Sequence, residues 1–145
     1  MGSLRIMITF SETERLEFEE YVDFLKRCDL GAQYPKRNFE SRVQALLKNV
    51  GICITARNQA GLLIGICFGI TDFAYFLFLT DLGVDRDYVG QGIGKALLSR
   101  AHQKAGGEED ITLTTISHKN ALGFYEACGL QPQKELVVKY CTAWE

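Results

Sequence analysis

The sequence predicts a mixed α/β fold (an α+β mixed sheet), in which helices pack against a central sheet of parallel and antiparallel strands. Three observations indicate this fold. Apolar β-rich segments and amphipathic helical segments follow one another along the chain, glycines separate many of them, and no internal repeat is present. The expected order is β-α-α-β-β-β-α-β-α-β. A chain of 145 residues usually builds one core, so we expect a single domain over residues 1–145.

The N-terminal part predicts one strand followed by two helices. Leu4–Phe10 is apolar and β-branched enough for a strand. Ser11 and Glu14 have the pattern of a capping box, and a helix ending at Gly31 is expected from apolar residues at helical spacing, namely Phe18, Tyr21, Val22 and Leu25. A second helix is expected between Pro35 and Gly51, with an apolar face formed by Phe39, Val43, Leu46, Leu47 and Val50.

Residues 52–84 predict three strands. Ile52–Arg57 and Leu62–Ile70 flank a short turn and predict a hairpin, and the aromatic segment Tyr75–Val84 predicts the next strand. We expect its aromatic side chains in the core, namely Tyr75, Phe76 and Phe78. A membrane span is the alternative for Gly61–Thr80, which carries one charge, but Thr71-Asp72 and several glycines divide it. Two buried strands fit better, and no membrane contact is expected.

The C-terminal part predicts a helix, a strand, a helix and a last strand. The first helix turns Ile93, Leu97 and Ala101 inward, and we expect His102 to face solvent. Ile111–Ile116 predicts a strand, Lys119–Cys128 a helix that Gly129 ends, and Leu136–Cys141 the last strand.

Charge and cysteine content exclude several classes of function. The 16 basic and 18 acidic side chains leave a net charge of −2, so no basic field is available for a nucleic acid. Such a balance is compatible with a cationic small substrate. No Cys-x-x-Cys pair occurs among the five cysteines, so neither disulfides nor a metal site is expected from Cys28, Cys53, Cys67, Cys128 and Cys141. No secretory signal is visible, and we expect a cytoplasmic protein.

A glycine-spaced turn after the aromatic strand has the pattern of an anion site. The strand ends in Asp81–Val84, and an amphipathic helix follows a turn containing Gly90, Gly92 and Gly94. Glycines let the backbone approach a phosphate, and the amides of a helix N-terminus favour negative charge. Two nucleotide motifs do not fit, because a Walker loop needs a hydroxyl where Ala96 stands and the dinucleotide fingerprint needs glycine at Lys95 or Leu97.

Two segments resemble the signatures of the GCN5-related N-acetyltransferase (GNAT) superfamily. Val84–Leu98 looks like its acetyl-CoA-binding motif, and His118–Leu130 resembles its second motif, a helix with an inward tyrosine followed by glycine. The resemblance covers about residues 52–140, whereas the N-terminal part matches only in having two helices after a strand. It implies the GNAT-like acyl-CoA N-acyltransferase fold.

The resemblance also implies roles for individual residues. The backbone of Leu82, Gly83 and Val84 corresponds to the strand end that accepts the pantetheine arm and polarises the thioester carbonyl. The pyrophosphate would lie on the turn amides of Val89, Gly90, Gln91, Gly92, Ile93, Gly94 and Lys95. Tyr125 matches the usual proton donor to the departing thiolate, and His118 and Phe124 are further candidates for cofactor binding. This chemistry requires no metal.

The general base is less well defined by the sequence. Some amine-acetylating relatives carry glutamate at the position of Thr80, which cannot act as a base. Asp81 is the nearest carboxylate and a candidate base, although strict strand alternation would place it on the opposite face from Thr80. A base acting through water is equally plausible. Tyr34-Pro35 lies between the first two helices, where the family shapes its acceptor site.

Together these features predict an acetyl-CoA-dependent N-acetyltransferase that acts on a small-molecule amine by direct transfer within a ternary complex. The alternatives are a non-catalytic acyl-CoA-binding module and a protein or peptide N-acetyltransferase. A homodimer is common among relatives and is expected here as an oligomeric state.

Overall fold

The computed structural model describes residues 7–31 and 34–143. Its centre is a five-stranded sheet in the order β1-β2-β3-β4-β5. The strands are β1 (Thr9–Ser11), β2 (Ile52–Arg57), β3 (Leu63–Thr71), β4 (Phe76–Val84) and β5 (Thr112–Thr115). Neighbouring strands from β1 to β4 run antiparallel, and β5 runs parallel to β4, so the predicted mixed sheet is confirmed.

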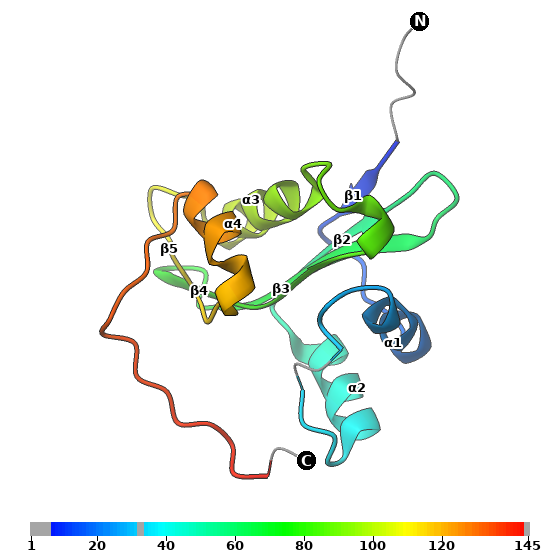
Figure 1. The fold of residues 1–145 in the computed structure, drawn as a ribbon, viewed down its shortest axis with the longest axis horizontal. Coiled ribbons are helices and arrows are strands. Elements are labelled where there is room, and N and C mark those ends of the chain that lie inside the picture. Colours follow the sequence, from blue (N-terminus) through cyan, green and yellow to red (C-terminus); the bar gives the residue numbers. More distant parts are fainter. Residues whose placement is uncertain (1–6, 32–33, 144–145) are drawn as a thin grey trace, which may run out of the picture.

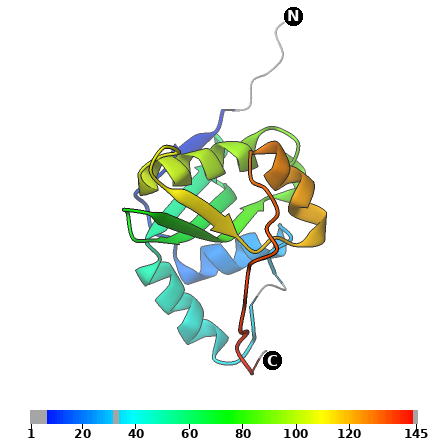
Figure 2. The ribbon, with the colours of Figure 1, turned by 90° about the vertical axis from the view of Figure 1, so that its left-hand side faces the viewer.

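The helices cover both faces of the sheet (Figures 1 and 2). On one face lie α1 (Phe18–Lys26) and α2 (Phe39–Asn49), and on the other lie α3 (Ile93–Ala105) and α4 (Leu122–Ala127). Short 3-10 turns, η1 (Arg86–Tyr88) and η2 (Lys119–Ala121), precede α3 and α4. Each face has its own apolar core, because alternate residues of the strands point to opposite sides.

The N-terminal elements are shorter than expected. The predicted strand covers residues 4–10, of which residues 4–6 lie outside the described residues. In the described part, pairing with β2 begins only at Thr9. The Ser11 hydroxyl does accept the N–H groups of Thr13 and Glu14, at 3.3 and 3.1 Å, but no helix follows directly. The carboxylate of Glu14 instead binds Arg57, and after a bend at Glu12-Thr13 the chain has no regular secondary structure until α1 begins at Phe18.

The prediction that Tyr75 and Phe76 lie in the core was wrong. Both are largely exposed, at 70% and 60%, because the turn between β3 and β4 carries them beyond the packed part of the sheet. This turn is fixed by Asp72, whose carboxylate accepts the N–H groups of Ala74, Tyr75 and Phe76. Phe78, farther along β4, is half-buried.

The predicted last strand at Leu136–Cys141 is also not formed. This segment has no regular secondary structure, and Val137 is 90% exposed. The preceding helix ends at Ala127 as α4, after the separate turn η2. A strand needs a neighbour that supplies its backbone hydrogen bonds, which local sequence alone cannot provide.

None of the helices within the described ranges combines the length and the apolar character that crossing a membrane requires.

One ion-pair cluster ties the N-terminal segment and α1 to the sheet. The Arg57 guanidinium donates to Glu14 at 2.7 and 3.2 Å and to both carboxylate oxygens of Glu20 at 2.8 Å. These hydrogen bonds from Arg57 lower the pKa of Glu14 and the pKa of Glu20 below their ordinary values. Folding stability therefore depends on these carboxylates being ionised.

We expect Arg57→Met to lower the free energy of unfolding by about 1 kcal/mol near pH 7, a value discounted for the partial exposure of the cluster. Because both folded-state pKa values are lowered, this contribution is present above the ordinary glutamate pKa of about 4.3 and is lost as the pH falls through the lower folded values. Urea unfolding at pH 7 and at about pH 3 measures it. The exposed Arg37→Met serves as control, and a difference between wild type and Arg57→Met that does not shrink in acid would contradict the assignment.

Candidate functional site

The site begins with one extra residue in β4. Phe68 of β3 pairs with Asp81 and Gly69 pairs with Leu79, so Thr80 is left over as a β-bulge. Before the bulge, Leu79 packs in the core against α3, whereas after it Asp81 lies opposite Phe68, in the core of α1 and α2. Strict alternation therefore fails here, and the Thr80 hydroxyl lies 3.4 Å from Asp81 Oδ2.

The bulge is also where β4 and β5 separate. Their parallel pairing covers Phe76 to Leu79, and its last pair is Leu79 with Thr115. From this point the edge of β4 that carries Leu82–Val84 has no strand partner on the β5 side among the described residues. Backbone amides and carbonyls at such an edge can pair with an extended ligand, as a further strand would. The residues predicted to accept a pantetheine arm thus lie at an opening in the sheet.

The glycine turn leads from this opening to α3. Gly90 and Gly92 have φ values of 80° and 83°, a left-handed conformation that residues with a side chain rarely adopt. The first helical hydrogen bond runs from the Ala96 N–H to the Gly92 carbonyl. The amides of Ile93 to Lys95 therefore have no acceptor inside the helix, and nothing lies within 4 Å of where a Cβ on Gly90 or Gly92 would stand. An open cradle of amides at a helix N-terminus fits a pyrophosphate.

The second motif lies directly against the first. An added Cβ on Gly94 would meet the Phe124 ring at 3.3 Å, so α4 packs on the first turn of α3. The Phe124 and Tyr125 rings meet edge to face, with centroids 5.2 Å apart. Burial raises the pKa of Tyr125, partly opposed by a hydrogen bond with the Thr115 side chain. The Tyr125 hydroxyl therefore stays protonated at neutral pH and lies where β4 and β5 separate.

The two histidines have structural contacts. His118 is exposed, and its Nδ1 accepts the Asn120 N–H at 3.4 Å, which caps η2. No described contact joins His118 to the glycine turn. The expectation that His102 faces solvent was wrong, because its Nε2 lies 2.7 Å from the Ile111 carbonyl oxygen and connects α3 to the segment before β5.

On the opposite face of the sheet, a buried polar pair lies beside the bulge. Asp81 is 2% exposed, and its Oδ2 accepts a hydrogen bond from the Tyr34 hydroxyl. Burial raises the pKa of Tyr34, and the Asp81 charge raises it further, so Tyr34 remains a donor. The sequence suggested Tyr34 only as part of an acceptor region. Its pairing with Asp81 joins positions 47 residues apart, which no local pattern indicates.

Tyr34 also forms one wall of a small cavity. The cavity has a volume of about 190 Å³ and lies between Tyr34-Pro35 and α2. Its other walls are mainly apolar and are formed by Phe39, Arg42, Val43 and Leu46. This cavity is large enough for a small organic group.

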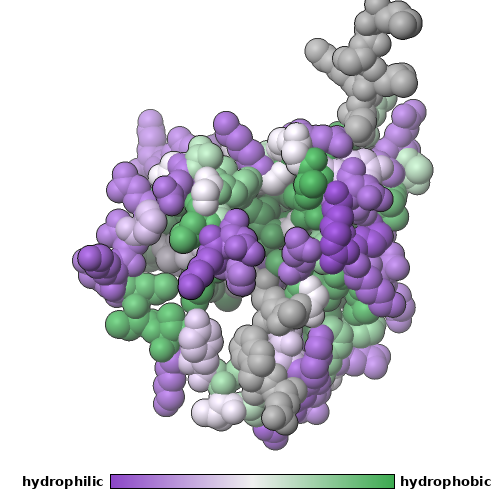
Figure 3. All heavy atoms as spheres, viewed as in Figure 1, coloured by the Kyte–Doolittle hydropathy of each residue, from purple (hydrophilic) through white to green (hydrophobic). Residues whose placement is uncertain are grey.

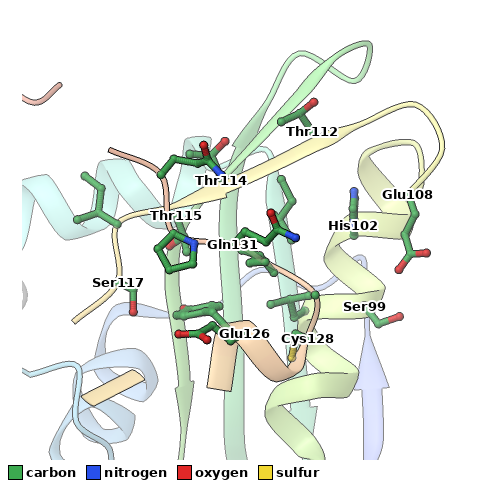
Figure 4. Close-up of a pocket in the computed structure, with 18 of the residues that line it drawn as sticks. Ser99, His102, Glu108, Thr112, Thr114, Thr115, Ser117, Glu126, Cys128 and Gln131 are labelled. Atoms are coloured by element: carbon green, nitrogen blue, oxygen red, sulfur yellow. The ribbon is translucent and has the colours of Figure 1, made fainter. Parts of the chain in front are cut away.

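A larger hollow, of about 1610 Å³, follows the outer side of β5 (Figure 4). Thr112, Thr114 and Thr115 of β5 line it, together with Ser99 and His102 of α3 and the end of α4. Tyr125 and Cys128 also border this hollow. The hollow therefore reaches Tyr125, the predicted proton donor.

No group of three or more histidine, cysteine, aspartate or glutamate side chains suited to a metal ion occurs in the described part of the chain.

The sequence of this chain matches a known protein-family model over the range that contains both motifs. Residues 49–132 match the family model described as "Acetyltransferase (GNAT) domain". This range contains both the glycine turn and the helix with Tyr125.

Individual relatives agree with this match. The chain is 28% identical over 126 residues to the soybean (Glycine max) protein named "Probable acetyltransferase TAP2", covering 80% of this chain and 50% of that protein. It thus spans about half the length of that curated relative. Among solved structures, an acetyltransferase of the GNAT family from Streptococcus pneumoniae has a TM-score of 0.66 at 21% identity, covering 92% of this chain and 98% of that one. A Staphylococcus aureus structure described as a probable acetyltransferase has a TM-score of 0.73 at 20% identity, covering 92% and 100%. At these identities the structures show the fold alone.

We expect Gly92→Ala to weaken the binding of CoA by about fivefold or more, because alanine in a left-handed conformation costs about 1–2 kcal/mol and the turn amides move to avoid it. Gly123→Ala on α4 is the matched control, since its added Cβ also meets nothing within 4 Å and no left-handed backbone is required there. Isothermal titration calorimetry with CoA measures both variants. Equal dissociation constants for the two would show that the turn does not bind the ligand.

Proposed function

The chain belongs to the GNAT acetyltransferase family, and we propose that it transfers an acetyl group from acetyl-CoA directly to the amine of a small molecule within a ternary complex. One observation carries this proposal. At the opening beside Thr80, the protonated hydroxyl of Tyr125 approaches from the α4 face, and the carboxylate of Asp81 with Tyr34 approaches from the α1 and α2 face. A proton donor and a proton acceptor therefore flank the same break in the sheet.

The residues of the opening and the turn suit the parts of acetyl-CoA. The amide cradle at Gly90–Lys95 would hold the pyrophosphate, and the free backbone edge at Leu82–Val84 would pair with the pantetheine amides. Acetyl-CoA supplies the activated acetyl group as a thioester. A backbone N–H at the β4 edge is fixed in place before the reaction, so it can stabilise the negative charge that develops on a carbonyl oxygen.

Tyr125 is suited to protonate the leaving thiolate. Burial raises the pKa of its hydroxyl, so the proton is present at neutral pH. A thiol with a pKa near 8.5 is a better leaving group when a positioned acid delivers a proton as the bond breaks. The Tyr125 side chain is uncharged before it donates its proton, and the Phe124 ring packs against the Tyr125 ring edge to face.

The buried pair on the other face is suited to take up the amine proton. An alkyl ammonium has a pKa of about 10.4 and must lose a proton before it attacks. The Tyr34 hydroxyl can accept this proton while passing its own to Asp81 Oδ2, with which it is already hydrogen-bonded. Because Tyr34 also lines the 190 Å³ cavity, an amine bound there would lie next to this pair. The apolar walls of the cavity favour a small amine that carries an apolar group.

The release of CoA thiol from acetyl-CoA tests the proposal directly. Polyamines, arylalkylamines, amino acids, peptides and aminoglycosides would be offered as separate pools. We expect release above the amine-free rate with small amines that carry an apolar group. Release with the peptide pool alone would favour a protein acceptor, and CoA binding without release in every pool would favour a non-catalytic binding module.

We expect Tyr125→Phe to lower kcat at least about tenfold while the affinity for acetyl-CoA stays nearly unchanged, because only the transferable proton is removed. Steady-state kinetics and a binding titration measure the two quantities. The exposed Tyr75→Phe is the matched control and should retain full activity. A Tyr125→Phe variant as active as wild type would remove Tyr125 from the mechanism.

We expect Asp81→Asn to lower kcat/KM for the amine about tenfold or more at pH 7, because asparagine keeps the shape and accepts the Tyr34 hydrogen bond but takes up no proton. The deficit should shrink as the pH rises toward 10, where more of the amine is already neutral. A pH–rate profile for wild type, Asp81→Asn and the exposed control Asp110→Asn measures this. A deficit that is constant across pH would assign Asp81 a purely structural role.

A further inference from the structure

The chain directly after α1 lies on the end of β4. A Cβ added to Gly83 would stand 2.5 Å from Cδ1 and 3.0 Å from Cγ of Leu30, and 3.5 Å from the Cys28 sulfur. The φ angle of Gly83 is not in the left-handed range, so the lack of space, and not the backbone conformation, excludes a side chain at this position. The half-buried Leu30 side chain therefore rests on bare backbone of β4.

This contact lies on the face of β4 from which the amine is proposed to approach. The neighbours of Gly83 in the strand, Leu82 and Val84, pack toward the core beneath α3, whereas Gly83 faces the end of α1. Asp81, the proposed proton acceptor, is two residues earlier and faces the same side as Gly83, because alternate residues of a strand share one face. Leu30 therefore lies next to the proposed base along the strand.

Polar contacts hold the backbone before Leu30 in place. The Arg27 guanidinium binds the Asp85 carboxylate at 2.5 Å. The Arg86 N–H donates to the Arg27 carbonyl at 2.9 Å, and the Arg86 guanidinium donates to the Cys28 carbonyl at 2.9 Å. Hydrophilic side chains gather at the surface where α1 and η1 lie, on the right-hand side of Figure 3. The segment that carries Leu30 is thus fixed against the end of β4 through its polar groups.

The position of Leu30 has a consequence for the acyl donor. The backbone edge at Leu82–Val84 is the part of β4 proposed to hold the thioester, and an acyl chain longer than acetyl needs additional space beside this edge. On the α3 face the strand's own side chains fill that space, and on the α1 face Leu30 and Cys28 fill it. Packed interiors tolerate added methylene groups poorly, so the length of the acyl chain is restricted here.

We propose that Leu30 selects the acyl group of the donor. Its side chain closes the space beside Gly83 on the α1 and α2 face, so that the site accepts an acetyl group and excludes the longer propionyl and butyryl groups. This inference rests on the proposed function, in which the Leu82–Val84 edge holds the acyl donor. Leu30 takes no part in proton transfer and determines specificity alone.

Calorimetric titration with acetyl-CoA and butyryl-CoA, without an amine, tests the inference independently of turnover. We expect the wild type to bind butyryl-CoA at least about tenfold more weakly than acetyl-CoA, and Leu30→Ala to bind the two within about twofold, because the smaller side chain leaves room for the two added carbons. Leu30→Val, a milder change for the fold, should fall between them. The exposed Leu62→Ala is the control and should keep the wild-type preference. The same preference in wild type and in both Leu30 variants would overturn the proposal.

Thermal unfolding tests the contact between Leu30 and Gly83. We expect Gly83→Ala to lower Tm by about 5 °C or more, because its methyl group meets the leucine side chain. In the double variant Leu30→Ala, Gly83→Ala the methyl group enters the space that the leucine leaves, so Tm should be higher than in Gly83→Ala alone. Strictly additive losses of Tm would show that the two positions do not touch and would count against the proposal.

Turnover separates a failure of this inference from a failure of the transferase function. With an accepted amine, kcat/KM for butyryl-CoA relative to acetyl-CoA should rise at least about tenfold in Leu30→Ala. If both acyl-CoAs bind but no donor releases thiol, the transferase function fails, and the binding preferences alone decide the role of Leu30. If thiol is released and the ratio does not change in Leu30→Ala, the transferase stands and the proposal for Leu30 is wrong. If neither acyl-CoA binds the wild type, both fail together.

Discussion

The single extra residue at Thr80 determines how the rest of the site is built. A regular β4 would place Leu79 and Asp81 on the same face, and the apolar core against α3 would then receive a carboxylate. The bulge instead keeps Leu79 in that core and turns Asp81 to the α1 and α2 face. It also ends the ladder with β5, and the Thr115 hydroxyl donates to the Leu79 carbonyl at 3.1 Å where the pairing stops. One insertion therefore creates both the opening and its polar lining.

A second set of contacts fixes the two sides of the opening relative to each other. Asp85, directly after β4, is 4% exposed and pairs with Arg27 at the end of α1, at 2.5 Å. Arg27 also donates to the Leu63 carbonyl of β3 at 2.8 Å. Arg86 reaches back to the Cys28 carbonyl at 2.9 Å. Asp85 and Arg86 begin the short turn η1, which leads into the glycine turn, so the position of the glycine turn depends on the end of α1. A buried pair of this kind mainly fixes geometry, since desolvation offsets much of its attraction.

The parts of the fold that the sequence predicted well are those whose causes are local. The glycine turn at positions 90–94, the start of α3 and the β2–β3 hairpin each follow from residues within a few positions. The parts that it missed depend on distant partners. The bulge at Thr80 requires the register with β3, and the link from Tyr34 to Asp81 crosses 47 residues. Residues 136–141 have strand propensity, but a strand also needs a neighbouring edge to pair with, so propensity alone predicted a strand that the structure does not form.

In the proposed direct transfer, the acid and the base stand on two faces of one sheet, and this separation has a chemical consequence. The proton that the amine loses and the proton that the thiolate gains need not be the same proton, because Asp81 with Tyr34 and Tyr125 lie on opposite sides of the break. In the proposed mechanism neither group has to change role within one transfer. After such a transfer Asp81 would hold a proton and Tyr125 would lack one, so both would have to exchange with solvent before the next cycle. Tyr125 borders the hollow along β5 and Tyr34 borders the cavity at α2, which gives each group its own route to solvent.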